Sequence, residues 1–172
     1  MTLDVEQCSI EGSDMEQKNA DELKARSRAA FDAQAETYDA GMQGDHARGL
    51  YRIVAGEVAR AGGGIDSPRV LDLGCGTGAL AEIVLDEIPG CALVGVDLSA
   101  NMAERAAERL GGRAEVVVGD AERLPFRDNS FDAAYCNDSF HHYPDPALAA
   151  FQVWRALRPG GTFVVGDVWQ PA

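Results

Sequence analysis

Residues that could hold a ligand follow the first short apolar run of the sequence. Asp72 lies inside that run, and Gly74, Gly76 and Gly78 follow it at alternate positions in LDLGCGTG. Glycine adopts positive φ readily and lets a ligand approach the backbone closely. If a helix begins at this point, its free N–H groups can receive an anionic group. The spacing therefore favours a ligand-binding loop over an ordinary strand-to-helix turn.

Two more acids follow later apolar runs. Asp97 lies 19 residues beyond the last of these glycines, about where a nucleotide-binding βαβ unit places an acid on a ribose. A carboxylate can accept two hydrogen bonds from a vicinal diol, and Ser99 suits the helix cap, so Asp97 is expected to be free for a ligand. Asp120, in GDAERLPF, can accept from an exocyclic amine such as that of adenine. Leu98 and Ala121 could pack on the faces of a purine.

A third group of polar residues could carry acid–base chemistry. Asp138, His141, His142 and Tyr143 follow the apolar run that ends at Asn137, and histidine titrates near neutral pH. Adjacent histidines point in different directions, so the alternative is that one of them only makes a hydrogen bond in the core. No further ligands stand at a recognisable metal-binding spacing, so no metal site is predicted.

Apolar strands alternating with amphipathic helices must position these residues. Helices are expected over 21–40, 46–61, 79–88, 100–110 and 146–157, and strands over 69–73, 91–97, 115–119, 131–137 and 162–168. This alternation predicts an α/β fold, a Rossmann-like three-layer sandwich with a mostly parallel sheet of five strands. Ligands of such sheets bind at the carboxyl ends of the strands, where all the singled-out residues lie.

Composition bounds the partners and the organisation of the chain. Its 172 residues suit one domain. With 28 acidic and 15 basic residues, the formal charge is −13, which disfavours a nucleic-acid backbone as partner. Residues 1–20 are expected to form a flexible acidic tail and residues 21–172 the folded domain. No apolar run is long enough for a membrane span. Four unpaired thiols suggest a reducing, cytoplasmic setting: Cys8, Cys75, Cys91 and Cys136.

Five motifs in order give the chain a family resemblance. They are VLDLGCGTG at 70–78, VGVDLS at 94–99, GDAERLPF at 119–126, FDAAYCNDSFHH at 131–142 and LRPGG at 157–161. Together with FDAQAETYD at 31–39 they resemble the class I S-adenosylmethionine-dependent methyltransferases. The similarity is greatest to the methyltransferase type 11 subgroup, which acts on small molecules such as ubiquinone and menaquinone precursors.

The resemblance implies methyl transfer from S-adenosylmethionine to a small-molecule acceptor. It places the methionine part of this cofactor on the glycine loop, the ribose on Asp97 and the adenine amine on Asp120. The implied cofactor-binding set is Tyr38, Asp72, Gly74, Cys75, Gly76, Thr77, Gly78, Asp97, Leu98, Asp120, Ala121 and Asn137. The catalytic residues stay open among Asp138, His141, His142 and Tyr143.

The resemblance also marks a departure. Class I enzymes continue past their fifth strand with a hairpin of strands six and seven, which this sequence lacks, so it is either a short natural form or a fragment. Strand 162–168 is then expected to form an open edge that favours self-association, only partly blunted by Trp169 and Pro171. A non-catalytic or partner-dependent S-adenosylmethionine-binding module is the alternative function. A nicotinamide-dependent dehydrogenase fits poorly, because its loop fingerprint is GxGxxG.

Overall fold

The computed structural model describes residues 5–41 and 45–167, and within them the side chains of all but residues 5–16 and His46. Within the described residues, two short 3-10 helices and ten longer elements follow one another. In order they are α1 (Val5–Gln34), α2 (Asp45–Ala61), β1 (Arg69–Leu73), α3 (Ala79–Glu87), β2 (Ala92–Asp97), α4 (Ala100–Leu110), β3 (Glu115–Val118), η2 (Ala121–Arg123), β4 (Phe131–Asn137), η3 (Phe140–His142), α5 (Pro146–Ala156) and β5 (Leu157–Gly166).

The five strands form one sheet in the order β3-β2-β1-β4-β5. Every neighbouring pair is parallel, and Asp72 of β1 lies between Gly95 of β2 and Tyr135 of β4. The predicted α/β fold with a parallel five-stranded sheet is therefore confirmed for the described residues. The chain moves outward from β1 to β3 and then returns to the other side of β1 at β4. This reversal leaves a crevice at the carboxyl ends of β1 and β4.

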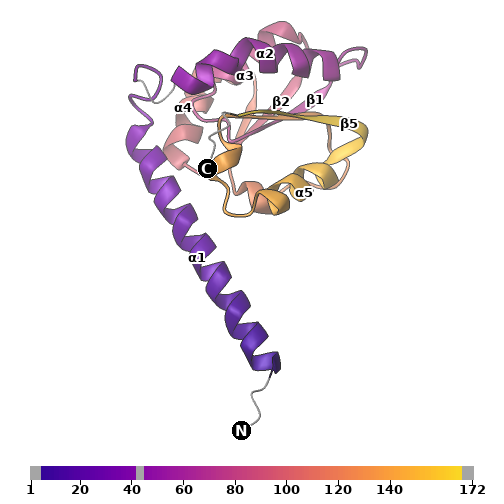
Figure 1. Cartoon of the computed structure of the whole chain (residues 1–172). Coiled ribbons are helices and arrows are strands. Elements are labelled where there is room, and N and C mark those ends of the chain that lie inside the picture. Colours follow the sequence, from indigo (N-terminus) through magenta and orange to yellow (C-terminus); the bar gives the residue numbers. More distant parts are fainter. Residues whose placement is uncertain (1–4, 42–44, 168–172) are drawn as a thin grey trace.

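Helices cover both faces of the sheet, as Figure 1 shows. Alternate residues of β1 face opposite layers, because successive side chains of a strand point to opposite faces. Val70 belongs to a buried cluster with residues of α2 and α3. Leu71 and Leu73 belong to a second buried cluster with residues of α5. Buried side chains thus pack against both faces of the central strands. This packing holds in place the strand ends at which the site forms.

The first helix differs from the expectation. It begins at Val5 rather than at residue 21 and ends at Gln34 rather than at residue 40, so most of the acidic segment continues the helix. Figure 1 shows the N-terminal part of α1 extending away from the sheet and its C-terminal part lying near α4. Asp32 fastens this end, because it accepts hydrogen bonds from the Ser99 hydroxyl at 2.5 Å and from the Asn101 amide at 3.2 Å. The expected flexibility of residues 1–20 stays a prediction.

The last strand also differs. It begins at Leu157, five residues before the expected start, because Leu157 already pairs with Phe131 of β4, while residues 158–161 form an irregularity before pairing resumes at Thr162. The register shifts between Phe131 and Ala133 of β4, and Pro159 is tolerated there because β5 is an edge strand. The expected last residue, Val168, lies outside the described residues, as do Trp169 and Pro171.

None of the helices that the structure describes is both long and apolar enough to cross a membrane.

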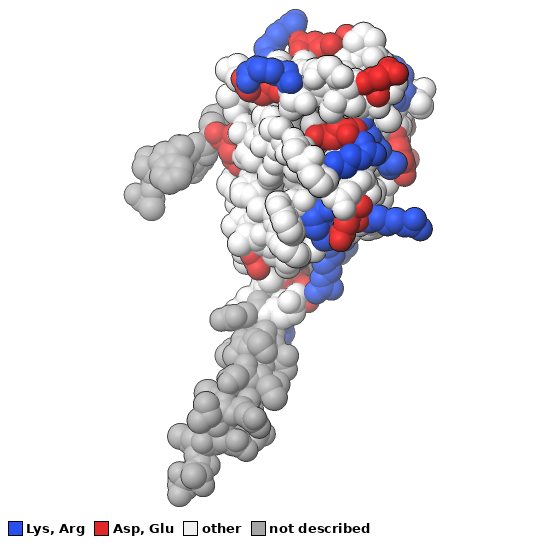
Figure 2. Space-filling view, turned by 90° about the vertical axis from the view of Figure 1, so that its right-hand side faces the viewer, with Lys and Arg blue, Asp and Glu red and all other residues white. Residues whose placement is uncertain are grey.

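Figure 2 shows that acidic and basic side chains alternate on one face of the molecule. Some acidic and basic side chains of the chain form ion pairs, such as Arg155 with Asp128 at 3.1 Å. Ion pairs of this kind contribute little to stability, at most about 1 kcal/mol each. The packing of the sheet against its helices, rather than the surface charges, therefore holds the site in place.

Candidate active site

The three glycines after β1 have different tasks. All have positive φ, at 72° for Gly74, 53° for Gly76 and 77° for Gly78. A side chain at Gly74 would strike the Ser139 side chain, and one at Gly78 would meet the Ala106 backbone at 3.1 Å. A side chain at Gly76 would meet nothing within 4 Å. Gly74 and Gly78 thus permit close packing, while Gly76 is where a ligand can approach the backbone.

Asp97 connects the end of β2 to this loop. One of its carboxylate oxygens accepts from the Gly76 amide at 2.8 Å, and the other accepts from the Ser99 amide at 2.9 Å. Ser99 caps α4 as predicted, because its hydroxyl accepts from the Met102 amide at 3.1 Å. Two backbone N–H groups thus already bind Asp97, and its expected role toward a ligand stays a prediction. A carboxylate offers about four lone-pair positions, so both oxygens can still accept from a ligand.

Asp72 is the most deeply buried acid of the site. Its exposed fraction is 3%, and the Tyr135 hydroxyl donates to it at 2.8 Å. Burial raises the pKa of Asp72 to about 7, against the lowering effect of this hydrogen bond, and nearby Asp97 raises it further. None of the described salt bridges involves Asp72, and a buried carboxylate in this state favours the arrival of a positively charged ligand group.

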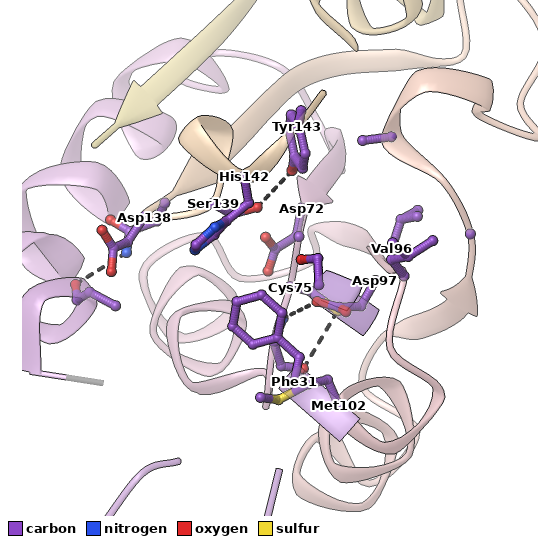
Figure 3. A pocket seen from close by; sticks show the side chains of 18 of the residues that line it. Phe31, Asp72, Cys75, Val96, Asp97, Met102, Asp138, Ser139, His142 and Tyr143 are labelled. Atoms are coloured by element: carbon purple, nitrogen blue, oxygen red, sulfur yellow. Dashed lines mark hydrogen bonds between the residues drawn. The ribbon is translucent and has the colours of Figure 1, made fainter. Parts of the chain in front are cut away.

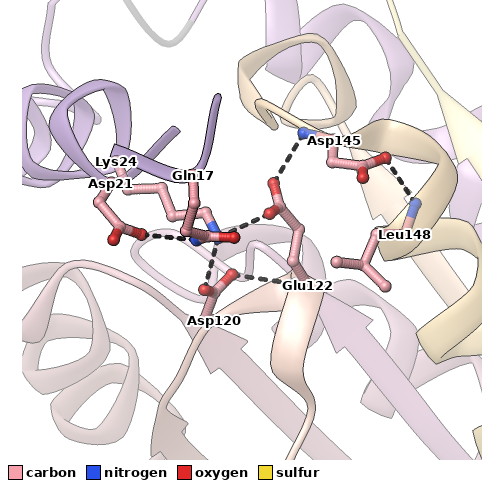
Figure 4. Close-up of polar contacts among 7 residues, drawn as sticks. All are labelled: Gln17, Asp21, Lys24, Asp120, Glu122, Asp145 and Leu148. Carbon is pink, nitrogen blue, oxygen red and sulfur yellow. Dashed lines mark hydrogen bonds and ion pairs between the residues drawn. The ribbon is translucent and has the colours of Figure 1, made fainter. Parts of the chain in front are cut away.

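Asp120 has a partner that the sequence did not reveal. The Lys24 ammonium of α1 lies 2.8 Å from Asp120 and 2.6 Å from Glu122 (Figure 4). Burial would lower the pKa of Lys24, but the hydrogen bonds and charges of both carboxylates outweigh it and raise the pKa. Glu122 also accepts from the Asp145 amide at 2.9 Å, where α5 begins. The only hint in the sequence is that Lys24 follows a segment rich in acids.

His142 and His141 differ in their surroundings. His142 lines the cavity, which His141 does not, and contacts the Phe31 ring edge to face, with 5.2 Å between ring centroids. Burial lowers its pKa, and so does His141, so His142 is neutral at neutral pH. The ring of His141 lies 41% exposed, 2.7 Å from the Asp167 carboxylate. His142 is therefore the histidine that faces the site.

Tyr143, another catalytic candidate, is held in its protonated form. The Tyr143 hydroxyl lies 2.7 Å from the Ser139 hydroxyl, and burial keeps its pKa well above the ordinary value. It stays protonated and is therefore unsuited to act as a base.

Asp138, His141 and Asp167 place ligand atoms within 4.8 Å of one another, a grouping that sequence spacing did not show. The absence of a metal site stays a prediction.

One cavity unites most of the predicted residues (Figure 3). Every predicted cofactor-binding residue except Gly78 lines it, and so do three of the four catalytic candidates, all but His141. Sequence reasoning missed several residues that the fold adds from the N-terminal helices and the strand ends. They are Lys24, Ser27, Phe31, Ala47, Tyr51, Leu80, Val96, Met102, Gly119, Glu122, Ser139 and Pro144.

Two buried polar side chains show how α2 and the loop before it meet the strand ends. The Asn137 amide nitrogen donates to the Ala47 carbonyl at 3.1 Å, while its buried side-chain oxygen has no hydrogen-bond partner among the described residues. The Thr77 hydroxyl donates to Asp39 at 2.8 Å, next to Tyr38 on the cavity wall. The loop carrying Tyr38 is thus fastened to the glycine loop.

Comparison with known proteins identifies this arrangement. Residues 71–165 match the model of a family described as "methyltransferase domain". The chain belongs to this methyltransferase family. It has the fold and ordered motifs of class I S-adenosylmethionine-dependent methyltransferases, so the resemblance seen in the sequence is confirmed.

Relatives named as methyltransferases support this. A ubiquinone/menaquinone biosynthesis C-methyltransferase of Desulfotalea psychrophila is 35% identical, covering 70% of this chain and 48% of the relative. A malonyl-[acyl-carrier protein] O-methyltransferase of Geobacter sulfurreducens is 37% identical, covering 79% and 50%. The chain thus spans about half the length of these curated relatives.

A solved structure provides a ligand-bound comparison. Haemonchus contortus phosphoethanolamine N-methyltransferase 2, in complex with phosphomonomethylethanolamine and S-adenosylhomocysteine, is 33% identical with a TM-score of 0.60. The match covers 66% of this chain and 27% of that one. Methyltransferases of one shared fold therefore serve different acceptors, so the acceptor of this chain must be argued from its own cavity.

Proposed function

We propose that this chain binds S-adenosylmethionine in the cavity at the ends of β1, β2 and β3 and transfers its methyl group to a small-molecule acceptor. The observation that carries the proposal is the contact between the Gly76 amide and the Asp97 carboxylate at 2.8 Å. This contact holds Asp97, which suits a ribose diol, beside Gly76. Of the three loop glycines, Gly76 is the one with open space where a side chain would lie.

The donor set fits the rest of the cofactor. The buried Asp72 carboxylate is positioned for an ammonium group, and the free N–H groups at the start of α3 suit a carboxylate. We assign Asp120 and the Ala121 amide to the amine and a ring nitrogen of adenine, and Leu98 and Met102 line the same cavity. When bound, S-adenosylmethionine supplies an activated methyl group for in-line displacement by a nucleophile.

The residues of this chain need only position the acceptor and receive its proton. Holding nucleophile and methyl group in near-attack geometry lowers most of the barrier. Phe31 and Tyr38, whose ring centroids lie 6.4 Å apart, form an aromatic wall beside His142. The neutral imidazole of His142 can take a proton from the acceptor, which identifies it as the best candidate base among the four.

Calorimetry tests the proposal. S-adenosylhomocysteine titrated into the chain should give one saturable site, whereas NAD should give none, because the loop lacks the dinucleotide spacing. A methyl-labelled cofactor incubated with the chain and a metabolite extract should then label a small molecule. Binding of NAD in place of S-adenosylhomocysteine would refute the proposal.

We also propose that the chain associates with itself through β5. This strand is an edge of the described sheet, and Val165 on it is 45% exposed. An edge with few charges is a template for pairing. Sedimentation over a concentration series should show dimers that Val165→Lys weakens, and a monomer at every concentration would contradict the idea.

A further inference from the structure

The order of the strands indicates how the cofactor extends across the cavity. Resting on the function proposed above, Asp120 after β3 is assigned to the adenine, Asp97 after β2 to the ribose and the glycine loop after β1 to the amino-acid part. These strands are neighbours in the order β3-β2-β1-β4, and adjacent strands lie about 4.8 Å apart. The next strand along this line is β4, so we expect residues that follow β4 to border the amino-acid part.

The chain turns back toward the glycine loop where β4 ends. Asp138 has a φ of 52°, a left-handed conformation that few residues other than glycine adopt. Beyond this turn, the side chains of Ser139 and Tyr143 lie on Gly74, the first glycine of the loop. A Cβ atom at Gly74 would strike the Ser139 hydroxyl and would come within 3.0 Å of the Tyr143 hydroxyl. The two hydroxyls thus occupy the space that a side chain at Gly74 would fill.

These two hydroxyls form a pair on the cavity wall. The Ser139 oxygen lies 2.7 Å from the Tyr143 oxygen, and both residues line the cavity (Figure 3). The Tyr143 oxygen also lies 3.7 Å from the Cys136 sulfur. Of the two oxygens, that of Ser139 comes closer to the Gly74 position. Tyr143 therefore holds the Ser139 hydroxyl in place against the loop.

Packing against the loop does not by itself require hydroxyl groups. Alanine and phenylalanine at these positions would keep the carbon atoms, and a buried hydroxyl costs free energy unless it makes hydrogen bonds. Among the described residues, the Ser139 side chain makes no capping hydrogen bond to η3, the short helix that it precedes. A serine hydroxyl can donate one hydrogen bond and accept two. Its bond with Tyr143 uses only part of this capacity, and the rest is available to a ligand.

The amino-acid part of the cofactor suits the Ser139 hydroxyl chemically. Its ammonium group needs acceptors and its carboxylate needs donors, and a hydroxyl provides both. Asp72, a buried acceptor, lies two residues before Gly74 on the neighbouring strand end. The adenosine end is assigned to β2 and β3, on the other side of β1 from β4. The amino-acid part is therefore the portion of the cofactor that meets Ser139.

We propose that the Ser139 hydroxyl binds the amino-acid part of the cofactor and that Tyr143 is a positioning residue, which holds this hydroxyl against the glycine loop. Sequence reasoning did not single out Ser139, and it considered Tyr143 only for acid–base chemistry. The proposal gives both residues a role in cofactor binding.

Two ligands that share an adenosine and a thioether test this inference. S-adenosylhomocysteine carries the amino-acid part, whereas 5′-methylthioadenosine has a methyl group in its place. In calorimetry, Ser139→Ala should weaken S-adenosylhomocysteine binding about tenfold, because a hydrogen bond to a charged group is worth about that factor. The affinity for methylthioadenosine should stay within about twofold of wild type. Retained binding of this second ligand also shows that the variant is folded.

Two further variants define the roles. Tyr143→Phe should weaken S-adenosylhomocysteine binding less than Ser139→Ala does. Added to Ser139→Ala it should cause no further loss, because a residue that acts through Ser139 has no effect once that hydroxyl is gone. Ser130→Ala is the matched control. Ser130 precedes β4 at the opposite end of the strand, and its hydroxyl donates to the Arg127 carbonyl at 2.7 Å, so both affinities should stay unchanged.

The outcomes separate this inference from the function on which it rests. Equal weakening of both ligands by Ser139→Ala would show that the hydroxyl only packs on the loop, and unchanged affinity for both would show that it binds neither; each result overturns the proposal. Losses that add fully in the double variant would overturn the positioning role of Tyr143. Failure of both ligands to bind the wild-type chain would instead refute the proposed function.

Discussion

The buried carboxylate of Asp72 should make both stability and cofactor binding depend on pH. It is 3% exposed, and burial raises its pKa from 3.8 to about 7. Because the folded chain holds this proton more tightly than the unfolded chain, the group contributes stability below pH 3.8. That contribution is lost as the pH rises toward 7.

The size of the effect follows from the two pKa values. At about 1.4 kcal/mol per pH unit of difference, ionising Asp72 between pH 4.5 and pH 7.5 costs about 3 kcal/mol of folding free energy. Asp72→Asn keeps an acceptor for the Tyr135 hydroxyl but cannot ionise. Urea unfolding at both pH values should therefore show wild type losing about 3 kcal/mol relative to the variant over this range.

Cofactor binding should respond in the opposite direction. An ammonium group at Asp72 favours the ionised carboxylate, so the affinity for S-adenosylhomocysteine should rise about tenfold from pH 6 to pH 8. Asp72→Asn should bind more weakly and show little of this dependence. His142 is present in both proteins, so its titration cancels in the comparison. If wild type and variant had the same slopes of stability and affinity with pH, the reasoning would be refuted.

Four further substitutions probe the site. Asp97→Ala should weaken S-adenosylhomocysteine binding at least about tenfold, since charged hydrogen bonds contribute about 1.5–3 kcal/mol each; equal calorimetric affinity would contradict the ribose assignment. Gly76→Val should block binding and, although its φ of 53° strains the backbone, should lose less stability in urea than Gly78→Val, which is strained in the same way and also meets α4; an equal loss of stability in both would show that the loop only packs. Lys24→Met should lower the free energy of unfolding by about 2 kcal/mol, since it leaves two carboxylates unpaired, and an unchanged urea midpoint would count against this.

Local patterns were sufficient to predict the sheet and the strand ends. β1 and β4 have the bounds that their apolar runs predict, because buried parallel strands leave a continuous apolar signal. The acids and glycines at the strand ends come together because parallel strands end at one edge. The early start of α1 was missed, since its acidic residues show no apolar period and helix propensity alone is a weak signal.

Contacts between distant segments could not be predicted. Lys24 meets Asp120 across 96 positions of sequence, and Asp39 meets Thr77 across 38. Neither pair has a spacing signal, because the fold alone brings the helices before β1 over the strand ends. The choice between His141 and His142 likewise needed the structure, since only His142 lines the cavity and contacts Phe31.

The most direct test of the account is to observe where the cofactor lies. Amide resonances of Gly76, Ser99 and Ala121 should shift when S-adenosylhomocysteine is added to isotope-labelled protein, because these N–H groups border the loop, ribose and adenine positions. The amides of α5 beyond its first turn should stay unchanged. Saturable shifts at those three positions are the result the account predicts. Shifts confined to other parts of the chain, or none at a millimolar concentration of ligand, would contradict it.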